Sequence, residues 1–351
     1  MIRELPRGPF GAYLHAHYRR TPGIVSRSAM GCGAIFMVQR VRPQIDSLID
    51  QGAIAETDPM LLEEMVSLVI DQGLDVVPLA EVRRRLAGRE TDRRFVSFTF
   101  DGAYRTTLES VVPLFRRHRL PFALFVSTDF LGSGSLPWWM TLEALVSGIT
   151  TLRLNRDGNT QEHACTTGAE KRACCARLFR EVSQMPNAER VPHVEALCLS
   201  HHLDIAAIAA REIASIADLK VLCEDPLVTI GSQAGGGRPL TELSYDEARE
   251  GLAASLDMLE SALGMRPQHI AYPPSLAFGV GPREFKLAAA LGVQTAVTAV
   301  EGALWPEHAG ELFALPRIAL DNDPATLVRA LMLSGGAAFG SGMTAIAKAT
   351  A

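Results

Sequence analysis

Short apolar runs alternate with segments of helical periodicity along most of this chain. Residues 33–41 and 120–127 are almost continuously apolar, which is typical of strands covered on both faces, and residues 95–101 form a third strand-like run. Between the first and third runs, residues 59–72 repeat apolar side chains every three or four positions, which predicts a helix that ends at Gly73. This alternation predicts parallel strands joined by crossover helices.

The same alternation continues in the second half of the chain. Further strands are predicted over residues 227–232, 269–272, 293–300 and 312–320. Ser244 and Glu247 form a capping box at the start of a long helix, and another helix is predicted over residues 282–291. Seven or eight strand units of this kind favour a (β/α) barrel over an open doubly wound sheet.

Residues 148–223 interrupt this pattern. They are predicted to be mainly helical and they hold most of the cysteines, so we interpret them as an insertion rather than a separate domain. Residues 1–30 are rich in Arg, Pro and His without a clear period, and we expect them to form an N-terminal arm. We place the barrel at residues 31–335 and a flexible C-terminal tail at residues 336–351.

Composition narrows the class of protein. Apolar residues make up 48% of the chain and charged residues 21%, which fits a globular core, and a net charge of -5 does not indicate a nucleic-acid-binding surface. No apolar stretch reaches the length of a membrane span, and residues 1–9 lack the apolar core of a signal peptide. Six scattered cysteines without Cys-x-x-Cys spacing fit reduced thiols, so we expect a cytoplasmic protein.

Asp101 is the strongest candidate for chemistry, because it ends a predicted buried strand. A carboxylate at the carboxyl end of a barrel strand lies where this fold class places its active-site groups. A metal-dependent hydrolase would need a second carboxylate here and histidines further along, and the chain has neither at the expected places. No glycine-rich phosphate loop follows a strand, which weakens a nucleotide-binding hypothesis.

Several segments form recognisable motifs in a defined order: residues 98–105 (FTFDGAYR), 230–248 and 271–273 (AYP). They resemble the three motifs of the polysaccharide deacetylases, the NodB-homology proteins of carbohydrate esterase family 4. Later framework segments are also similar: residues 281–284 and 315–318. The resemblance extends over roughly residues 30–335, and it implies a distorted (β/α) barrel of the polysaccharide deacetylase type with a helical insertion.

The resemblance also implies a chemistry. In this family one Asp and two His hold a metal that polarises the amide carbonyl of an N-acetyl sugar and activates a water, and a second Asp acts as the base. The base aligns with Asp101, but the metal-binding aspartate aligns with Gly102 and the two histidines align with Gln233 and Gly237. A further histidine of the family aligns with Gln39. Neutral amides are poor ligands and glycine has no side-chain donor, so no cofactor is expected, and zinc only if the ligands are displaced.

Other residues of the expected pocket have more than one interpretation. Arg238 could take the electrostatic place of the metal and pair with Asp101, but we favour a framework role that points away from the pocket. Tyr104 and Tyr272 could stack on sugar rings or serve in packing. Asp101 itself is expected to be a retained structural or sugar-binding carboxylate rather than a base.

Three functions remain open. We favour a catalytically silent deacetylase homologue of glycan or exopolysaccharide metabolism that binds an N-acetylated oligo- or polysaccharide or a protein partner. The second hypothesis is an active glycan N-deacetylase with displaced metal ligands. The third is a metal-free hydrolase in which Asp101 works with another carboxylate, such as Glu301 or Asp321.

Overall fold

The computed structural model covers most of the predicted barrel and its insertion. The described residues are 31–44, 47–49, 54–88, 94–156, 159–233, 240–273, 280–323, 326 and 330. The predicted N-terminal arm and C-terminal tail lie outside these residues. Within the described part of the chain, no helix combines the length and the apolar character needed to cross a membrane.

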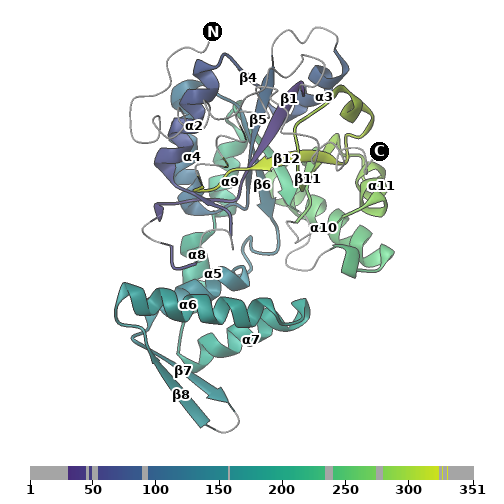
Figure 1. Ribbon diagram of the computed structural model, residues 1–351. Helices are drawn as coiled ribbons and strands as arrows, with labels where there is room; N and C mark the ends of the chain where they lie inside the picture. The colour runs from purple at the N-terminus through teal and green to yellow at the C-terminus, as the bar shows by residue number, and fades with distance from the viewer. Residues whose placement is uncertain are drawn as a thin grey trace, which may run out of the picture.

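Seven parallel strands close into a barrel (Figure 1). In chain order they are β1 (Gly33–Val38), β5 (Phe95–Asp101), β6 (Phe122–Ser127), β9 (Val228–Gln233), β10 (His269–Ala271), β11 (Thr295–Glu301) and β12 (Leu315–Ala319). Around the ring the order is β1-β12-β11-β10-β9-β6-β5, and β5 pairs back with β1. The prediction of a (β/α) barrel is confirmed. Because these strands run in one direction, their carboxyl ends meet at one end of the barrel.

Two short strand pairings flank the ring. Strand β4 (Asp75–Val76) pairs with the start of β5. Beyond the carboxyl end of β1, β2 (Arg40–Val41) pairs in parallel with β3 (Glu56–Thr57). The predicted single strand over residues 33–41 is therefore two strands, separated at Gln39.

Strand β5 separates two apolar cores. Phe98 and Phe100 point outward, where their rings pack edge to face on Phe115 of α4 (Arg105–His118), with 5.1 and 5.4 Å between ring centroids. Thr99 and Asp101 point inward, where both accept hydrogen bonds from one side chain of β12. The inner core is built from residues of six strands: Ile35, Phe95, Ala123, Phe125, Ala271, Val297 and Leu315.

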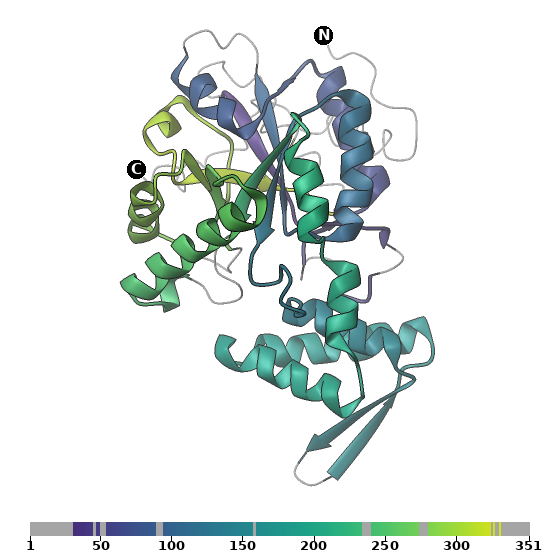
Figure 2. The same ribbon diagram turned by 180° about the vertical axis from the view of Figure 1, so that it is seen from behind.

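Helices surround the barrel (Figures 1 and 2). Besides α4 they are α2 (Pro59–Asp71), α3 (Leu79–Ala87), α10 (Tyr245–Leu263) and α11 (Pro282–Ala290), with the short 3-10 helices η3 (Leu240–Glu242) and η4 (Pro306–Gly310). The predicted capping box of α10 is present, since Ser244 and Glu247 exchange side-chain to backbone hydrogen bonds. Gly264 ends this helix with a φ of 77°, a conformation that glycine adopts without steric cost.

The insertion between β6 and β9 extends from one end of the barrel (Figure 1). Its elements are α5 (Trp138–Gly148), β7 (Thr151–Arg156), β8 (Asn159–Ala164), α6 (Gly168–Ser183), α7 (Asn187–Ser200) and α8 (Ile205–Glu212). Helix α9 (Ile216–Cys223) follows them and packs against β9 and α10 in the helix layer of the barrel. The insertion is mainly helical, but β7 and β8 form an antiparallel hairpin that the sequence pattern did not predict. This hairpin has few buried apolar side chains: Leu152 and Leu154 are buried in β7, whereas β8 is mostly exposed.

Candidate functional site

Asp101 is held in a buried ion pair with Arg317 of β12. The Asp101 side chain is 2% exposed and the Arg317 side chain is 0% exposed. Nη1 of Arg317 donates to Oδ1 of Asp101 at 2.6 Å, and Nη2 donates to Oδ2 at 2.8 Å. This bidentate arrangement satisfies both carboxylate oxygens with charge-assisted hydrogen bonds. The carboxylate therefore lies at the carboxyl end of β5, as predicted, with its charge compensated by an arginine 216 positions away.

Arg317 makes two further hydrogen bonds. Nε donates to the carbonyl oxygen of Thr298 at 2.7 Å, and Nη1 also donates to the hydroxyl of Thr99 at 3.1 Å. The guanidinium lies 5.8 Å from the centroid of the Phe125 ring. Gly231 on the neighbouring strand leaves room for that ring, because a Cβ at position 231 would lie 2.5 Å from it. Five strands thus build the environment of this one ion pair.

Gly102, which aligns with the metal-binding aspartate of the family, has a φ of 80°. Its backbone N–H donates to the carbonyl oxygen of Phe125 at 2.8 Å. A Cβ at position 102 would lie 2.5 Å from the ring of Tyr104. That ring is confined, because it packs edge-on against Trp139 at 6.2 Å between centroids and lies 6.0 Å from the guanidinium of Arg40. A side chain here would need both a left-handed backbone and displacement of a buried ring.

Both tyrosines of the predicted pocket serve in packing. Tyr104 is 8% exposed and Tyr272 is fully buried. The hydroxyl of Tyr272 donates to the carbonyl oxygen of Phe313 at 3.0 Å, and its ring contacts Phe285 at 5.9 Å between centroids. Burial raises the pKa of both phenols, so both stay protonated. No face of the Tyr272 ring is exposed in this structure.

The two glutamines at expected histidine positions lie at the same end of the barrel as Asp101. Gln39 follows the last residue of β1, which pairs with β5 one residue before Asp101. Gln233 is the last residue of β9. Both side chains are half-buried. Gly237 and Arg238 lie outside the described residues, and so does the predicted pair of Arg238 with Asp101.

The described residues of this site do not fit the metal centre that the resemblance implies. Position 102 offers no side-chain donor, and the amide of Gln233 is a poor transition-metal ligand. His269 is buried at the start of β10, where its Nδ1 and the Thr295 hydroxyl are hydrogen-bonded at 2.8 Å, and burial lowers its pKa to about 4. Within the described ranges, no group of three or more His, Cys, Asp or Glu side chains is arranged to hold a metal ion.

The two carboxylates considered for metal-free hydrolysis also follow barrel strands. Glu301 is exposed at the end of β11, in register with Arg317. Asp321 follows β12 and, together with Gln44 and Asn322, lines a cavity of about 310 Å³. Both carboxylates therefore belong to the carboxyl end of the barrel, where Asp101 lies.

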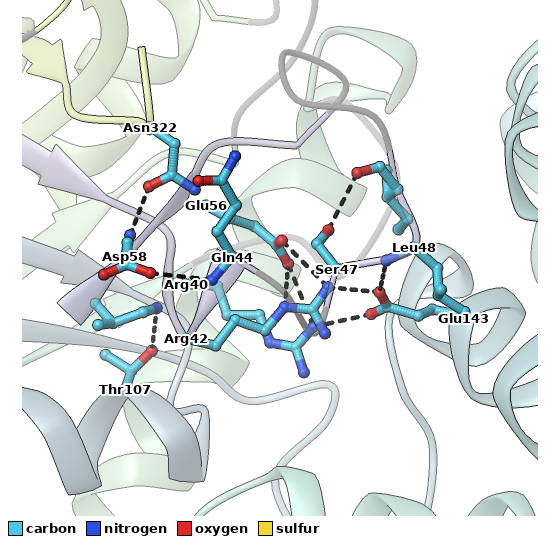
Figure 3. Close-up of polar contacts among 12 residues, drawn as sticks. Arg40, Arg42, Gln44, Ser47, Leu48, Glu56, Asp58, Thr107, Glu143 and Asn322 are labelled. Carbon is cyan, nitrogen blue, oxygen red and sulfur yellow. Dashed lines mark hydrogen bonds and ion pairs between the residues drawn. The ribbon is translucent and has the colours of Figure 1, made fainter. Parts of the chain in front are cut away.

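The sequence pattern gave no indication of a buried cluster of charges around Arg40 and Arg42 (Figure 3). Arg40 donates to Glu143 of α5 at 3.1 Å and to Glu212 of α8 at 2.9 Å, and Arg42 donates to Glu56 of β3 at 3.1 Å and also to Glu143. The Glu212 side chain is 32% exposed, whereas the other four are nearly fully buried. In the sequence, the only indication of this cluster is that two arginines follow a buried strand. Their acidic partners lie 14 to 172 positions away, and no local pattern connects them to these arginines.

This charged cluster attaches the insertion to the barrel. Glu143 belongs to the first helix of the insertion and Glu212 ends α8, so two elements far apart in the insertion bind Arg40 on β2. A backbone hydrogen bond of 2.8 Å from Ala214 to Ala103 adds a direct contact. The insertion therefore packs against the segment that follows Asp101.

Comparison with known proteins supports the fold assignment. No family model matches the chain, and no curated protein matches its sequence. Among solved structures, the deacetylase PplD of Streptococcus pyogenes in complex with acetate aligns with a TM-score of 0.53 and 15% identity, over 85% of this chain and 96% of that one. IcaB from Ammonifex degensii aligns with a TM-score of 0.52 and 14% identity, over 86% of this chain and 97% of that one. The chain has the polysaccharide deacetylase fold that its motifs predicted.

Proposed function

We propose that this chain is a deacetylase-like protein of glycan or exopolysaccharide metabolism that binds an N-acetylated glycan and does not hydrolyse it with a bound metal. The proposal rests mainly on the residue at position 102. The resemblance requires a metal-binding carboxylate there, but the residue is a glycine with a left-handed φ. The buried ring of Tyr104 fills the space into which a side chain would project. Both the ligand and the room for it are absent.

The end of the barrel at which Asp101 lies supports a binding role. This is the carboxyl end of the barrel strands, where proteins of this architecture place their ligand sites. Asp101 itself is buried, and its two hydrogen bonds to Arg317 hold the carboxylate in place without a metal. One structural neighbour is a deacetylase in complex with acetate, which makes the acetyl group of an N-acetylated sugar the first ligand chemistry to test.

Three measurements on the purified full chain test the proposal. Metal content after incubation with zinc, cobalt or nickel is measured by mass spectrometry, acetate release is measured with chito-oligosaccharides, and binding of the same oligosaccharides is measured by calorimetry. We expect no stoichiometric metal and no acetate release, together with saturable binding. The fully deacetylated oligosaccharides are the matched control, and they should bind more weakly.

The alternatives give different results. Stoichiometric metal together with acetate release that a chelator abolishes would establish the active deacetylase and overturn the proposal. Acetate release that survives the chelator would favour the metal-free hydrolase. Equal binding of acetylated and deacetylated oligosaccharides, or no binding, would refute the recognition of an N-acetylated glycan.

Restoring the family ligands provides a separate test of position 102. From the alignment alone, the triple variant Gly102→Asp, Gln233→His, Gly237→His should regain metal binding. The position of the Tyr104 ring changes this expectation, because the Cβ atom of any new side chain at position 102 would lie 2.5 Å from the ring. We expect metal uptake only when Tyr104→Ala is added. A folded triple variant that binds metal with Tyr104 intact would contradict the steric argument.

A further inference from the structure

The core of the insertion is unusually rich in cysteine. Four of the six cysteines of the chain lie in one buried apolar cluster of the insertion: Cys165, Cys174, Cys175 and Cys198. All are thiols in this structure. All four are buried, and two of them lie next to each other.

Cys165 and Cys174 are neighbours in this cluster. Cys165 directly follows β8, and its backbone N–H donates to the carbonyl oxygen of Thr150 at 2.8 Å. Cys174 lies near the start of α6, and its thiol contacts the carbonyl oxygen of Ala164 at 3.5 Å. Ala164 is joined to Cys165 by a peptide bond, so this contact places the sulfur of Cys174 beside the backbone of Cys165. The end of the hairpin and the second turn of α6 therefore bring the two cysteines together inside one buried apolar cluster.

We propose that Cys165 and Cys174 form a reversible disulfide that links the β7–β8 hairpin to α6. With a glutathione-type disulfide as the oxidant, one cysteine thiolate attacks a sulfur of the oxidant, and a mixed disulfide forms as one glutathione thiol leaves. The second cysteine thiolate then attacks the mixed disulfide and releases the second glutathione thiol. Two electrons and two protons pass from the pair to the oxidant, and one intramolecular S–S bond forms.

Burial sets the conditions for this reaction. Desolvation raises the pKa of Cys165 to about 12, so little thiolate exists in the folded protein at neutral pH. Oxidation therefore requires local opening of the insertion, or it takes place during folding in an oxidising compartment. Once formed, the bond favours the closed insertion, because it constrains the open state. The insertion packs against the segment after Asp101, so the redox state of the pair would affect the stability of the candidate site.

Peptide mapping can identify the bond directly. The full chain is refolded from denaturant in a glutathione redox buffer, alkylated and cleaved with trypsin. Cys165 falls in the peptide 157–171, whereas Cys174 and Cys175 fall in the peptide 173–177. We expect these two peptides to be linked, with a mass 2 Da below the sum of their reduced masses. The link should persist in Cys175→Ala and be absent in Cys174→Ala. Amide exchange in α6 should slow by roughly tenfold to a hundredfold on oxidation.

Other outcomes would overturn the proposal. If the two peptides stay unlinked after refolding in the redox buffer, the contact does not mature into a bond. If the link is lost in Cys175→Ala, the neighbouring thiol is the true partner. In the unmodified chain, fragmentation of the linked peptide shows which of Cys174 and Cys175 carries the alkyl group, so the bonded cysteine is identified even if a variant fails to fold.

Discussion

Substitution of Arg317 by Met removes the guanidinium that holds Asp101 inside the barrel. Both side chains are almost inaccessible, so water cannot replace the lost partner without rearrangement of the inner core. Removing one member of a buried ion pair costs about 3–5 kcal/mol, because the other charge remains buried and uncompensated. The carbonyl oxygen of Thr298 also loses its donor, which adds about 1 kcal/mol. We expect Arg317→Met to lower the free energy of unfolding by about 4–6 kcal/mol.

Urea unfolding followed by fluorescence and circular dichroism measures this loss. Arg266→Met is a matched control, because Arg266 also forms ion pairs, with Asp257 at 2.6 Å and Glu260 at 2.7 Å, but its side chain is 32% exposed. Exposed pairs contribute below about 1 kcal/mol. The double variant Asp101→Asn, Arg317→Met should lose less stability than the sum of the two single variants, because the buried charge is removed with its partner.

Two results would refute this reasoning. A loss for Arg317→Met no larger than that of the Arg266→Met control would mean that the buried pair does not stabilise the barrel. Strict additivity in the double variant would mean that the two side chains act independently, despite their bidentate contact.

Three further predictions concern single side chains. Gly102→Ala should cost about 2–5 kcal/mol in urea unfolding, because alanine must adopt a left-handed conformation against the Tyr104 ring; an equal loss in a Tyr104→Ala background would contradict the steric cause. Burial lowers the pKa of His269 from 6.5 to about 4, so the unfolded chain binds a proton first as the pH falls. About 3 kcal/mol of stability should be lost between pH 6.5 and 4, and this slope should disappear in His269→Gln; an unchanged slope would refute the assignment. Arg40→Met should raise amide exchange in α5 and α8 by more than tenfold while the barrel strands stay protected, and a uniform rise would count against local attachment.

The barrel could be predicted from sequence because each of its elements has a local signal. The expected strand over residues 227–232 is β9, displaced by one residue, and the Ser244 capping box marks the true start of α10. The end of β5 at Asp101 was also correct, because an apolar run stops there at a charged residue. These features depend on neighbours within one strand or one helical turn.

The contacts of the candidate site could not be predicted in the same way. Arg317 sits in a Leu-Pro-Arg-Ile segment that resembles framework, and nothing in the pattern assigns its guanidinium to Asp101. The cluster around Arg40 joins β2, β3, α5 and α8, so its partners become visible only after the chain has folded. The resemblance aligns the metal-binding aspartate of the family with Gly102, but it gives no sign of the Tyr104 ring that fills the space beside this residue.

Closure of the barrel also bears on aggregation. Because β5 pairs with both β1 and β6, the ring leaves none of its seven strands with an unpaired side. In the described part of the chain, the β7–β8 hairpin is the longest sheet whose outer edges remain open to another molecule. Polar and charged side chains on an edge strand discourage such pairing, and β8 exposes Thr160, Gln161 and Glu162. Because β8 is polar, the sequence pattern does not predict it as a strand. The same polarity discourages the hairpin from pairing with a sheet of a neighbouring copy.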